Sequence, residues 1–474
     1  MSAYSHVLVI GAGAFGASAA LELAQLGHRV TIVDQSLDGH ASKSAASHDL
    51  NKIIRADYTD PLYRDLGKKA IELWRSHPLY APYFHEVGIF FRSGRPSSVD
   101  APWIKTGVKN ATEPVGNAYS TENAPSKHPT ARAITSMEES VHVFPESLRP
   151  HLGPAYTTFG DQKQVGYFNP QAGWANAREA TFSVLDEAQR LGATVHSNVT
   201  IEKFLYARAH GKQRVCGAIA NDGRVFHADQ VILAAGSWTP SLLEQCQLPL
   251  PKGLLKPSAH CVLTIRIQPQ VARLFRGTPV LFDMNTGMYA FEPNADGILK
   301  CAIHGVRATC SRQTGSSSPE PASASSTSFP SADQHPHVDV MLRELQNMYP
   351  VLRLGDPDSP AQIHFTRTCW YCDTRDENFL IDFHPDVDGL LVASGDSGHG
   401  LKFLPLLGRL IVSRLLGIQN NTAIAPDHGL SEHQRRVFSF DHHIHADARM
   451  DASVPIDSMR IGDLPPAKVP SAKL

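Results

Sequence analysis

The strongest constraint on the fold is a strand, glycine turn, helix and strand pattern at the start of the chain. Gly11, Gly13 and Gly16 give the spacing G-x-G-x-x-G after the apolar run VLVI, and Asp34 ends the next apolar run. In a βαβ unit these glycines permit a tight turn, let the backbone approach a pyrophosphate, and let helix and strand pack closely. The carboxylate of Asp34 can accept hydrogen bonds from the ribose hydroxyls of the dinucleotide. The segment predicts a dinucleotide site, with Ala14 and Phe15 in its turn.

Length and charge bound the remaining possibilities. The chain has 474 residues, enough for two domains, and is 42% hydrophobic and 19% charged, as expected of a globular protein. The formal net charge of −2 favours neither nucleic acid nor an anionic membrane surface as a partner. No apolar run is long enough to span a bilayer, and we expect no signal peptide, since the first strand runs directly into glycines. The 7 cysteines are odd in number and sparse, which favours reduced thiols.

Two late segments indicate FAD and not a nicotinamide cofactor. Residues 227–240 form an apolar strand ending at Gly236, and residues 389–417 form a strand, a second glycine-rich turn and a helix. FAD-dependent amine oxidases return to their cofactor through such late segments, which bring backbone N–H groups to the flavin. The turn supplies three candidate cofactor-binding positions, Asp396, Gly398 and Gly400, and we expect Val199 to meet the adenine.

The predicted fold class is α/β, with a discontinuous Rossmann-type FAD domain and an antiparallel-sheet substrate domain. We assign 1–80, 160–249 and 366–425 to the FAD domain, and 81–159 and 250–365 to the substrate domain. Residues 311–336 are rich in Ser, Pro and Ala and are expected to be a disordered insertion.

The C-terminal segment 426–474 is expected to be a solvated tail. It contains the cluster DHHIHAD, in which His442, His443, His445 and Asp447 resemble metal ligands. Their spacing does not place them on one helix face and no second cluster supports them, so no metal is expected.

The stretch RTCWYCDTRDENFLIDFHP contains two cysteines three positions apart, Cys369 and Cys372. Zinc would need two further ligands at compatible spacing, and a thioredoxin-type pair opens a helix, whereas these cysteines lie between two extended segments. A third possibility is that one thiol is bonded to a flavin.

From Cys369 through the GDSGHG turn to the following helix, the chain resembles the monomeric sarcosine oxidase family. That family includes pipecolate and saccharopine oxidases and the fructosyl amino acid oxidases, or amadoriases. The resemblance implies that Cys369 carries FAD as an 8α-S-cysteinyl thioether and that Cys372 is incidental. SAASHDLNKIIRADY, residues 44–58, is similar to the family's second signature, which brings basic residues to the flavin. Its cofactor-binding candidates are Ser44, Asn51 and Lys52.

The resemblance also implies the chemistry. Family members oxidise the C–N bond of a secondary amino acid, pass the electrons to O2 and release H2O2. Lys402 and Arg55 match the residues that bind the substrate carboxylate, and Lys300 matches the lysine held to promote the oxygen reaction. From residue type alone, Lys402 could be a solvated helix residue and Lys300 an outward strand position.

Substrate choice is expected to depend on His304, four residues after Lys300. Sarcosine oxidases carry histidine here and amadoriases carry glutamate, so His304 favours sarcosine, pipecolate or saccharopine over a fructosyl amino acid. From residue type alone, His304 could equally be a core histidine. Tyr371 is a further candidate lining residue.

Several alternatives remain open at this stage. The enzyme could be an amadoriase, a flavin dehydrogenase with a non-oxygen acceptor, or an inactive FAD-binding scaffold, and its role could be catabolic or biosynthetic. We expect a monomer that binds an amino acid substrate and O2, with neither nucleic acid nor membrane as partner. The final residues Ala472, Lys473 and Leu474 differ by one residue from a peroxisomal address, which predicts peroxisomal import by its receptor.

Overall fold

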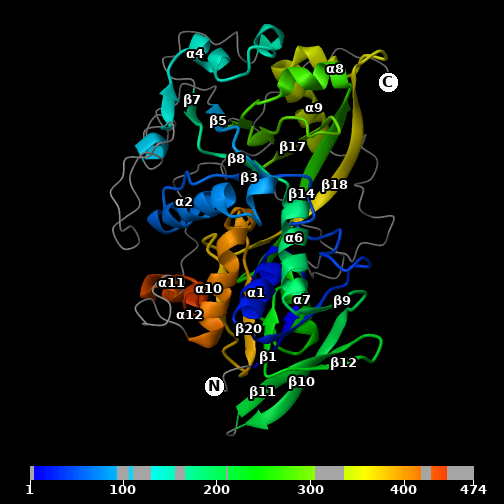
Figure 1. The fold of residues 1–474 in the computed structure, drawn as a ribbon, viewed down its shortest axis with the longest axis vertical. Helices are drawn as coiled ribbons and strands as arrows, with labels where there is room; N and C mark the ends of the chain where they lie inside the picture. The colour runs from blue at the N-terminus through cyan, green and yellow to red at the C-terminus, as the bar shows by residue number, and fades with distance from the viewer. Residues whose placement is uncertain are drawn as a thin grey trace.

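A computed structural model describes residues 5–92, 106–109, 130–154, 166–209, 212–284, 286–304, 336–417 and 429–445. Figure 1 shows two lobes, each built around one large sheet, with the long strands β14 and β18 running from the upper lobe toward the lower one. Residues 311–335 of the expected insertion lie outside the described residues, and its last residue, Pro336, begins a helix. The C-terminal Ala472–Lys473–Leu474 also lies outside them.

The lower lobe contains a six-stranded sheet with the strand order β19-β20-β13-β1-β2-β9, in which all neighbours are parallel except β19 and β20. Its strands are rich in Val, Ile and Leu because both faces are covered, as is typical of parallel sheets. They are β1 (His6–Ile10), β2 (Arg29–Val33), β9 (Thr194–His196), β13 (Gln230–Leu233), β19 (Leu380–Phe383) and β20 (Leu390–Ser394). The antiparallel strands β10 (Ile201–Ala209), β11 (Lys212–Ala220) and β12 (Val225–His227) form a separate sheet beside it.

Three helices lie side by side over this sheet in Figure 1, with α1 in the middle. Helices α1 and α10 approach closely because Gly408 has no Cβ: one built there would lie 2.2 Å from the carbonyl oxygen of Ser18. The Ser18 hydroxyl donates to the Leu404 carbonyl at 2.8 Å and accepts from the Gly408 N–H at 2.7 Å. The helices are α1 (Ala14–Gln25), α6 (Ala177–Arg190) and α10 (Leu404–Leu416).

The upper lobe contains an eight-stranded sheet with the order β18-β14-β17-β16-β15-β5-β7-β6, antiparallel except for the pair β15 and β5. Helix α9 packs against β14 and β17. The elements are β5 (Ile89–Arg92), β6 (Arg132–Ile134), β7 (Gly166–Asn169), β14 (Lys256–Ile267), β15 (Val280–Asp283), β16 (Met288–Ala290), β17 (Ile298–Ile303), β18 (Ala361–Asp373), α4 (Met137–His142), α8 (Pro269–Ala272) and α9 (Pro336–Met348).

Smaller elements join the lobes. A three-stranded sheet pairs β8 with both β3 and β4, and α2 packs on α10. These are β3 (Lys52–Ile54), β4 (Phe84–His85), β8 (Gly173–Ala175), α2 (Pro61–Ser76) and α7 (Thr239–Gln245).

The chain passes from one sheet to the other at residues that differ from the expected domain boundaries. β7, at 166–169, belongs to the upper sheet although it follows the expected boundary at 160, because it pairs with β5 and β6. β18 stays in the upper sheet through Asp373, past the expected boundary at 366, because its pairing with β14 continues to the pair Lys256 and Asp373.

The prediction of a solvated C-terminal tail is wrong for residues 429–445. They form helices α11 (Glu432–Val437) and α12 (Phe440–His445), which lie beside α10 in Figure 1. Phe438 and Phe440 are buried in two neighbouring hydrophobic clusters. The Phe438 carbonyl accepts from the Ile381 N–H at 2.9 Å, which holds the segment against β19. Apolar residues at these positions make burial more favourable than solvation.

No helix among the described residues is long and apolar enough to cross a membrane.

The first glycine turn depends on a very close backbone approach. A Cβ on Gly16 would lie 1.8 Å from the Gly11 carbonyl oxygen, and Gly11 itself has φ +104. Gly16→Ala should therefore destabilise the protein by more than about 3 kcal/mol, since the helix would have to move off the strand. The measurement is the denaturant midpoint together with flavin content.

Gly223→Ala is the control without a close contact: a Cβ added there would meet no atom within 4 Å, although Gly223 has a positive φ, +85, which the helical Gly16 lacks. It should cost only about 1–2 kcal/mol from backbone strain. Equal effects of the two substitutions would contradict the role given to close packing at Gly16.

Candidate active site

One large cavity of about 1540 Å³ runs from the first glycine turn to the strands of the upper sheet. Both lobes contribute to its wall. The cavity is therefore long enough to hold an elongated cofactor and a small molecule together.

Most of the predicted site residues line this cavity. They are Gly11, Gly13, Ala14, Phe15, Asp34, Lys52, Arg55, Val199, Gly236, His304, Tyr371, Asp396, Gly398, Gly400 and Lys402. Five others do not: Gly16, Ser44, Asn51, Lys300 and Cys369 are buried behind the lining residues.

The nucleotide end of the cavity fits a dinucleotide. Helix α1 begins after Gly13, with no side-chain cap and no acidic residue in its first turn. The N–H groups of this turn are therefore available to a phosphate. The Ser47 hydroxyl and the Trp238 indole Nε1 are buried, line the cavity and have no hydrogen-bond partner among the described residues. Such orphaned polar atoms are expected where a polar ligand completes the structure.

Asp34 is more constrained than the sequence suggested. Its Oδ2 accepts from the Ala12 N–H at 2.7 Å and its Oδ1 from the Ser36 N–H at 2.8 Å. Burial raises the pKa of this carboxyl, and these backbone donors oppose the shift. Asp34 thus holds the glycine turn in shape as well as facing the cavity beside Val199.

The two cysteines of the C-x-x-C pattern point to opposite faces of β18. Side chains alternate along a strand, so positions 369 and 372 cannot share a face. Cys369 packs with the upper-lobe cluster of Tyr289 and Tyr371, whereas Cys372 packs in the lower-lobe cluster. The pattern is therefore neither a disulfide nor a chelating pair in this fold.

A buried charge cluster lies next to Cys369. Asp49 Oδ2 accepts from Lys52 Nζ at 2.6 Å and from Lys300 Nζ at 2.8 Å, and Lys52 Nζ lies 3.3 Å from the Cys369 Sγ. Lys300 also donates to the Asn51 carbonyl at 2.6 Å. One carboxylate therefore fixes two lysines, of which Lys52 reaches the cavity and Lys300 stands behind it.

Burial and pairing act differently on these groups. Burial lowers the pKa of Lys300 to about 8, an effect that the Asp49 charge opposes only in part. Burial also acts to lower the pKa of Lys52, but Asp49 outweighs it and raises that pKa above its usual value. Burial likewise acts to raise the pKa of Asp49, but the charges of both lysines hold it well below its usual range. Asp49 is thus an anion at any ordinary pH.

Lys402 and Arg55 form a second cationic site. Both line the cavity and lie near the ring of Tyr58, whose centroid is 4.7 Å from the Arg55 Cζ and 5.6 Å from the Lys402 Nζ. Among the described residues neither cation is ion-paired to a carboxylate. Lys402 donates to the His399 carbonyl at 3.2 Å, and Arg55 to the Asp57 carbonyl at 2.5 Å. Burial, together with the Arg55 charge, lowers the pKa of Lys402 well below its usual value. An anion bound here would relieve that repulsion.

The second glycine turn closes the cavity around Tyr371. A Cβ on Gly398 would lie 2.4 Å from the Tyr371 ring, and Gly398 has φ +72. Asp396 accepts from the Cys372 N–H at 2.9 Å and the Gly398 N–H at 3.2 Å, which ties the turn to β18. Burial raises the pKa of Asp396 to about 7. Tyr371 in turn stacks on His260 with ring centroids 3.9 Å apart.

Sequence analysis missed several residues at the site. Asp49 lies inside the 44–58 segment, yet only the fold shows that it joins Lys52 to Lys300. Tyr58, His399 and Asp376 also line the cavity. Tyr58 lies in the segment 44–58 and His399 lies in the GDSGHG turn, and their membership of these motifs could have identified them as site residues. Asp376 becomes part of the site through its contacts with the C-terminal helices.

Asp49→Asn should leave two buried lysines without an anion and destabilise the protein by about 3–5 kcal/mol. Asp49→Asn combined with Lys300→Met should recover part of that loss, because one unpaired charge is removed. Denaturant unfolding of the three variants measures both effects.

The exposed pair of Asp222 and Arg224 supplies the control. Asp222→Asn should leave the unfolding midpoint unchanged. A double variant no more stable than Asp49→Asn alone would show that the buried lysines do not depend on this carboxylate.

Comparison with known proteins finds relatives over most of the chain. The chain is 28% identical to L-saccharopine oxidase of Schizosaccharomyces pombe, over 87% of this chain and 90% of that one. It is 25% identical to amino acid oxidase imqH of Aspergillus flavus, over 92% and 97%. It is 22% identical to monomeric sarcosine oxidase of Bacillus sp. strain B-0618, over 93% and 97%.

Among solved structures, fructosyl amine:oxygen oxidoreductase (Amadoriase I) of Aspergillus fumigatus matches with a TM-score of 0.72 and 26% identity, covering 95% of this chain and 92% of that one. Amadoriase II from the same organism shares the fold, with a TM-score of 0.74 and 24% identity over 96% and 94%. The model of the family described as FAD dependent oxidoreductase matches residues 6–414, and the chain belongs to that family.

Proposed function

We propose that this enzyme oxidises the C–N bond of a secondary amino acid, such as sarcosine, pipecolate, saccharopine or an N-methylated biosynthetic intermediate, with O2 as acceptor. The imine formed is hydrolysed and H2O2 is released. The observation that carries the proposal is the pair of the buried Lys402 and the half-buried Arg55, two cations that face the same cavity as the dinucleotide turn. The names of the relatives, saccharopine, amino acid and sarcosine oxidases, support the substrate class.

The cationic pair fits a substrate carboxylate. Guanidinium and ammonium groups in a water-poor pocket bind carboxylates through charge-assisted hydrogen bonds. The aromatic rings of Tyr58 and Tyr371, which line the cavity, favour a small, partly apolar amino acid. His304 lines the same cavity and is proposed to contact the substrate, as the family resemblance implies for this position.

The cofactor is proposed to be joined to Cys369 as an 8α-S-cysteinyl FAD. When bound, FAD supplies the two-electron acceptor that the side chains of this chain lack. Lys52 Nζ donates to the Cys369 sulfur at 3.3 Å, so this sulfur lies directly behind a cation that lines the cavity. Ser44, Asn51, Gly236 and Val199 remain proposed cofactor contacts; the fully buried Asn51 side chain, without a partner among the described residues, supports its assignment.

The lysine cluster is proposed to promote the reaction with O2. A fixed cation stabilises the anion formed when O2 accepts an electron. Lys300, held by Asp49 and the Asn51 carbonyl, is placed behind Lys52 and cannot swing away. A flavin dehydrogenase with another acceptor would not need this cluster.

A second candidate function is deglycation of fructosyl amino acids. The structural similarity to Amadoriase I and the size of the cavity favour it. His304 opposes it, since the resemblance places glutamate there in amadoriases. H2O2 release from fructosyl-lysine at a rate above that from any secondary amino acid would establish the deglycating activity instead.

Location and assembly are also proposed. A peroxisome suits an enzyme that releases H2O2, and the peroxisomal names of the human and mouse relatives support it. We propose import through the terminal Ala-Lys-Leu by the peroxisomal receptor, and a monomeric enzyme.

The covalent link has a direct test. Acid-denatured wild-type protein should retain its yellow colour on the polypeptide, whereas Cys369→Ser should release all flavin. Cys372→Ala is the matched control and should retain it, because that thiol faces the other side of β18. Peptide mapping that finds Cys369 as a free thiol in active enzyme would refute the link.

The oxygen role predicts a pH dependence. With a pKa of about 8, Lys300 is a cation below pH 8 and neutral above it, so flavin reoxidation by O2 should slow as pH rises through 8. Lys300→Met should slow reoxidation by about 100-fold or more at pH 7 and remove this dependence, while anaerobic reduction by substrate stays close to wild type. Stopped-flow absorbance measures both half-reactions, and unchanged reoxidation in Lys300→Met would discard the role.

A screen of secondary amino acids for peroxide production tests the function itself. Turnover of at least one N-alkyl or cyclic amino acid is expected. Absence of peroxide from all of them, in preparations that hold flavin, would overturn the proposal.

A further inference from the structure

We propose that Tyr58 and His399 form a hydrogen-bonded pair that recognises the N–H of the substrate amine, and that the C-terminal helices hold this pair in position. The inference rests on the proposed function, because it places the amine next to the carboxylate site of Lys402 and Arg55. The sequence motifs assign no role to either side chain.

The tautomer of His399 is determined by its surroundings. Its Nε2 lies 2.9 Å from the Glu377 carbonyl oxygen. A carbonyl only accepts, so Nε2 carries the hydrogen and Nδ1 of the neutral ring is an acceptor. Burial, with the charges of Lys402 and Arg55, holds the pKa of His399 well below its usual value, so the ring is neutral. His399 therefore presents a fixed acceptor at Nδ1.

That acceptor orients the hydroxyl of Tyr58. The Tyr58 Oη lies 3.0 Å from the His399 Nδ1. Since Nδ1 can only accept, the single hydroxyl hydrogen of Tyr58 points to it. Burial raises the pKa of Tyr58, which keeps the hydroxyl protonated. Any further partner of this oxygen must consequently be a hydrogen-bond donor.

The position of Tyr58 matches the amine of a bound amino acid. Its ring centroid lies 4.7 Å from the Arg55 Cζ and 5.6 Å from the Lys402 Nζ, and both Tyr58 and His399 line the cavity. In an α-amino acid the nitrogen is separated from the carboxylate by one carbon. A carboxylate held by the two cations therefore brings its amine close to the Tyr58 ring. An amine with one N–H satisfies the donor requirement, and a tertiary amine in its neutral form does not.

The Glu377 carbonyl that fixes the tautomer is itself held by a clamp. Glu377 has φ +62, a left-handed conformation that is unfavourable for a residue with a side chain. Such a conformation persists only where neighbouring contacts impose it.

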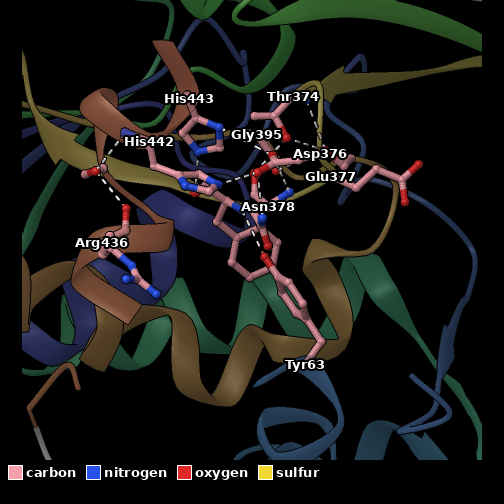
Figure 2. Close-up of polar contacts among 12 residues, drawn as sticks. Tyr63, Thr374, Asp376, Glu377, Asn378, Gly395, Arg436, His442 and His443 are labelled. Atoms are coloured by element: carbon pink, nitrogen blue, oxygen red, sulfur yellow. Dashed lines mark hydrogen bonds and ion pairs between the residues drawn. The ribbon is translucent and has the colours of Figure 1, made fainter. Parts of the chain in front are cut away.

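Figure 2 shows the contacts next to Glu377, where the Asp376 carboxylate lies among Asn378, His442 and His443. Asp376 accepts from the Asn378 Nδ2 at 2.7 Å, and its Oδ2 lies 2.6 Å from the His442 Nε2. His443 Nε2 lies 3.1 Å from the Phe379 carbonyl, so α12 grips the loop on both sides of Asn378. The segment expected to be a tail thus supports the active site.

Tyr58→Phe tests the pair in the flavin-loaded enzyme. The two ligands are the best secondary amino acid from the peroxide screen and its isostere with CH2 in place of NH, butanoate for sarcosine or cyclohexanecarboxylate for pipecolate. Tyr58→Phe should weaken binding of the amino acid by about 10-fold and leave that of the isostere unchanged. Anaerobic stopped-flow reduction at varied amino acid concentration gives the dissociation constant of the amino acid, and a flavin absorbance titration gives that of the isostere. Equal weakening of the two ligands would show a general structural effect and overturn the proposal.

A double-variant cycle tests whether His399 acts through Tyr58. His399→Leu should raise the KM for the amino acid as Tyr58→Phe does, and the double variant should be no worse than either single one. His399→Asn, whose Oδ1 can take the place of Nδ1, should restore part of the affinity. Additive losses would contradict the pairing.

The clamp is tested by Asp376→Asn against Glu432→Gln, an exposed change on α11. Asp376→Asn should raise the KM for the amino acid several-fold at unchanged affinity for the isostere, and Glu432→Gln should change neither. If wild-type enzyme oxidises no secondary amino acid, the proposed function fails. If wild-type enzyme oxidises a secondary amino acid but Tyr58→Phe binds it as tightly as wild type does, the proposed role of the Tyr58–His399 pair is wrong and the proposed function stands.

Discussion

The structure depends above all on the long pairing of β14 with β18. The two strands pair antiparallel over their whole length, from Ala361 opposite Ile267 to Asp373 opposite Lys256, with one register shift next to Thr264. Because the end of β18 is hydrogen-bonded to the second glycine turn, the same strand belongs to the upper sheet and reaches the lower lobe. The Cys372 carbonyl accepts from the Ser397 N–H at 3.1 Å, and Asp396 accepts from the Cys372 N–H. The lobes are thus joined at the residues that line the cavity.

This strand also explains how two cysteines of one motif acquire different environments. A period of two sends Cys369 to the upper-lobe face and Cys372 to the lower-lobe core. On its own face, Cys369 meets Lys52, which is held by Asp49, which in turn holds Lys300. A single buried carboxylate therefore couples the proposed attachment site to the proposed oxygen site. Buried charges of this kind are costly unless each has a partner.

The second cationic site is organised differently. Lys402 and Arg55 both lie near the Tyr58 ring and repel one another, with no carboxylate ion pair among the described residues, and this leaves a site ready for an anion from outside the chain. Behind them, His399, Glu377 and Asp376 connect the site to α12 by hydrogen bonds. Structural requirements and ligand requirements are thus separated: Asp49 satisfies one pair of cations, and the substrate is proposed to satisfy the other.

The sequence by itself determined the features that depend on local chemistry. The glycine spacing at Gly11–Gly16 and the apolar runs of the parallel strands predicted the nucleotide domain, because turns and strand periodicity are local properties. The family resemblance assigned Lys402, Arg55 and Lys52, which do line the cavity. Only the tertiary structure decided that β7 joins the upper sheet, that residues 429–445 are packed helices, and that Asp49, His399 and Asp376 join the site. These depend on partners far apart in the chain, such as Lys300 for Asp49 and His442 for Asp376, and no local pattern specifies which distant side chain a buried charge will meet.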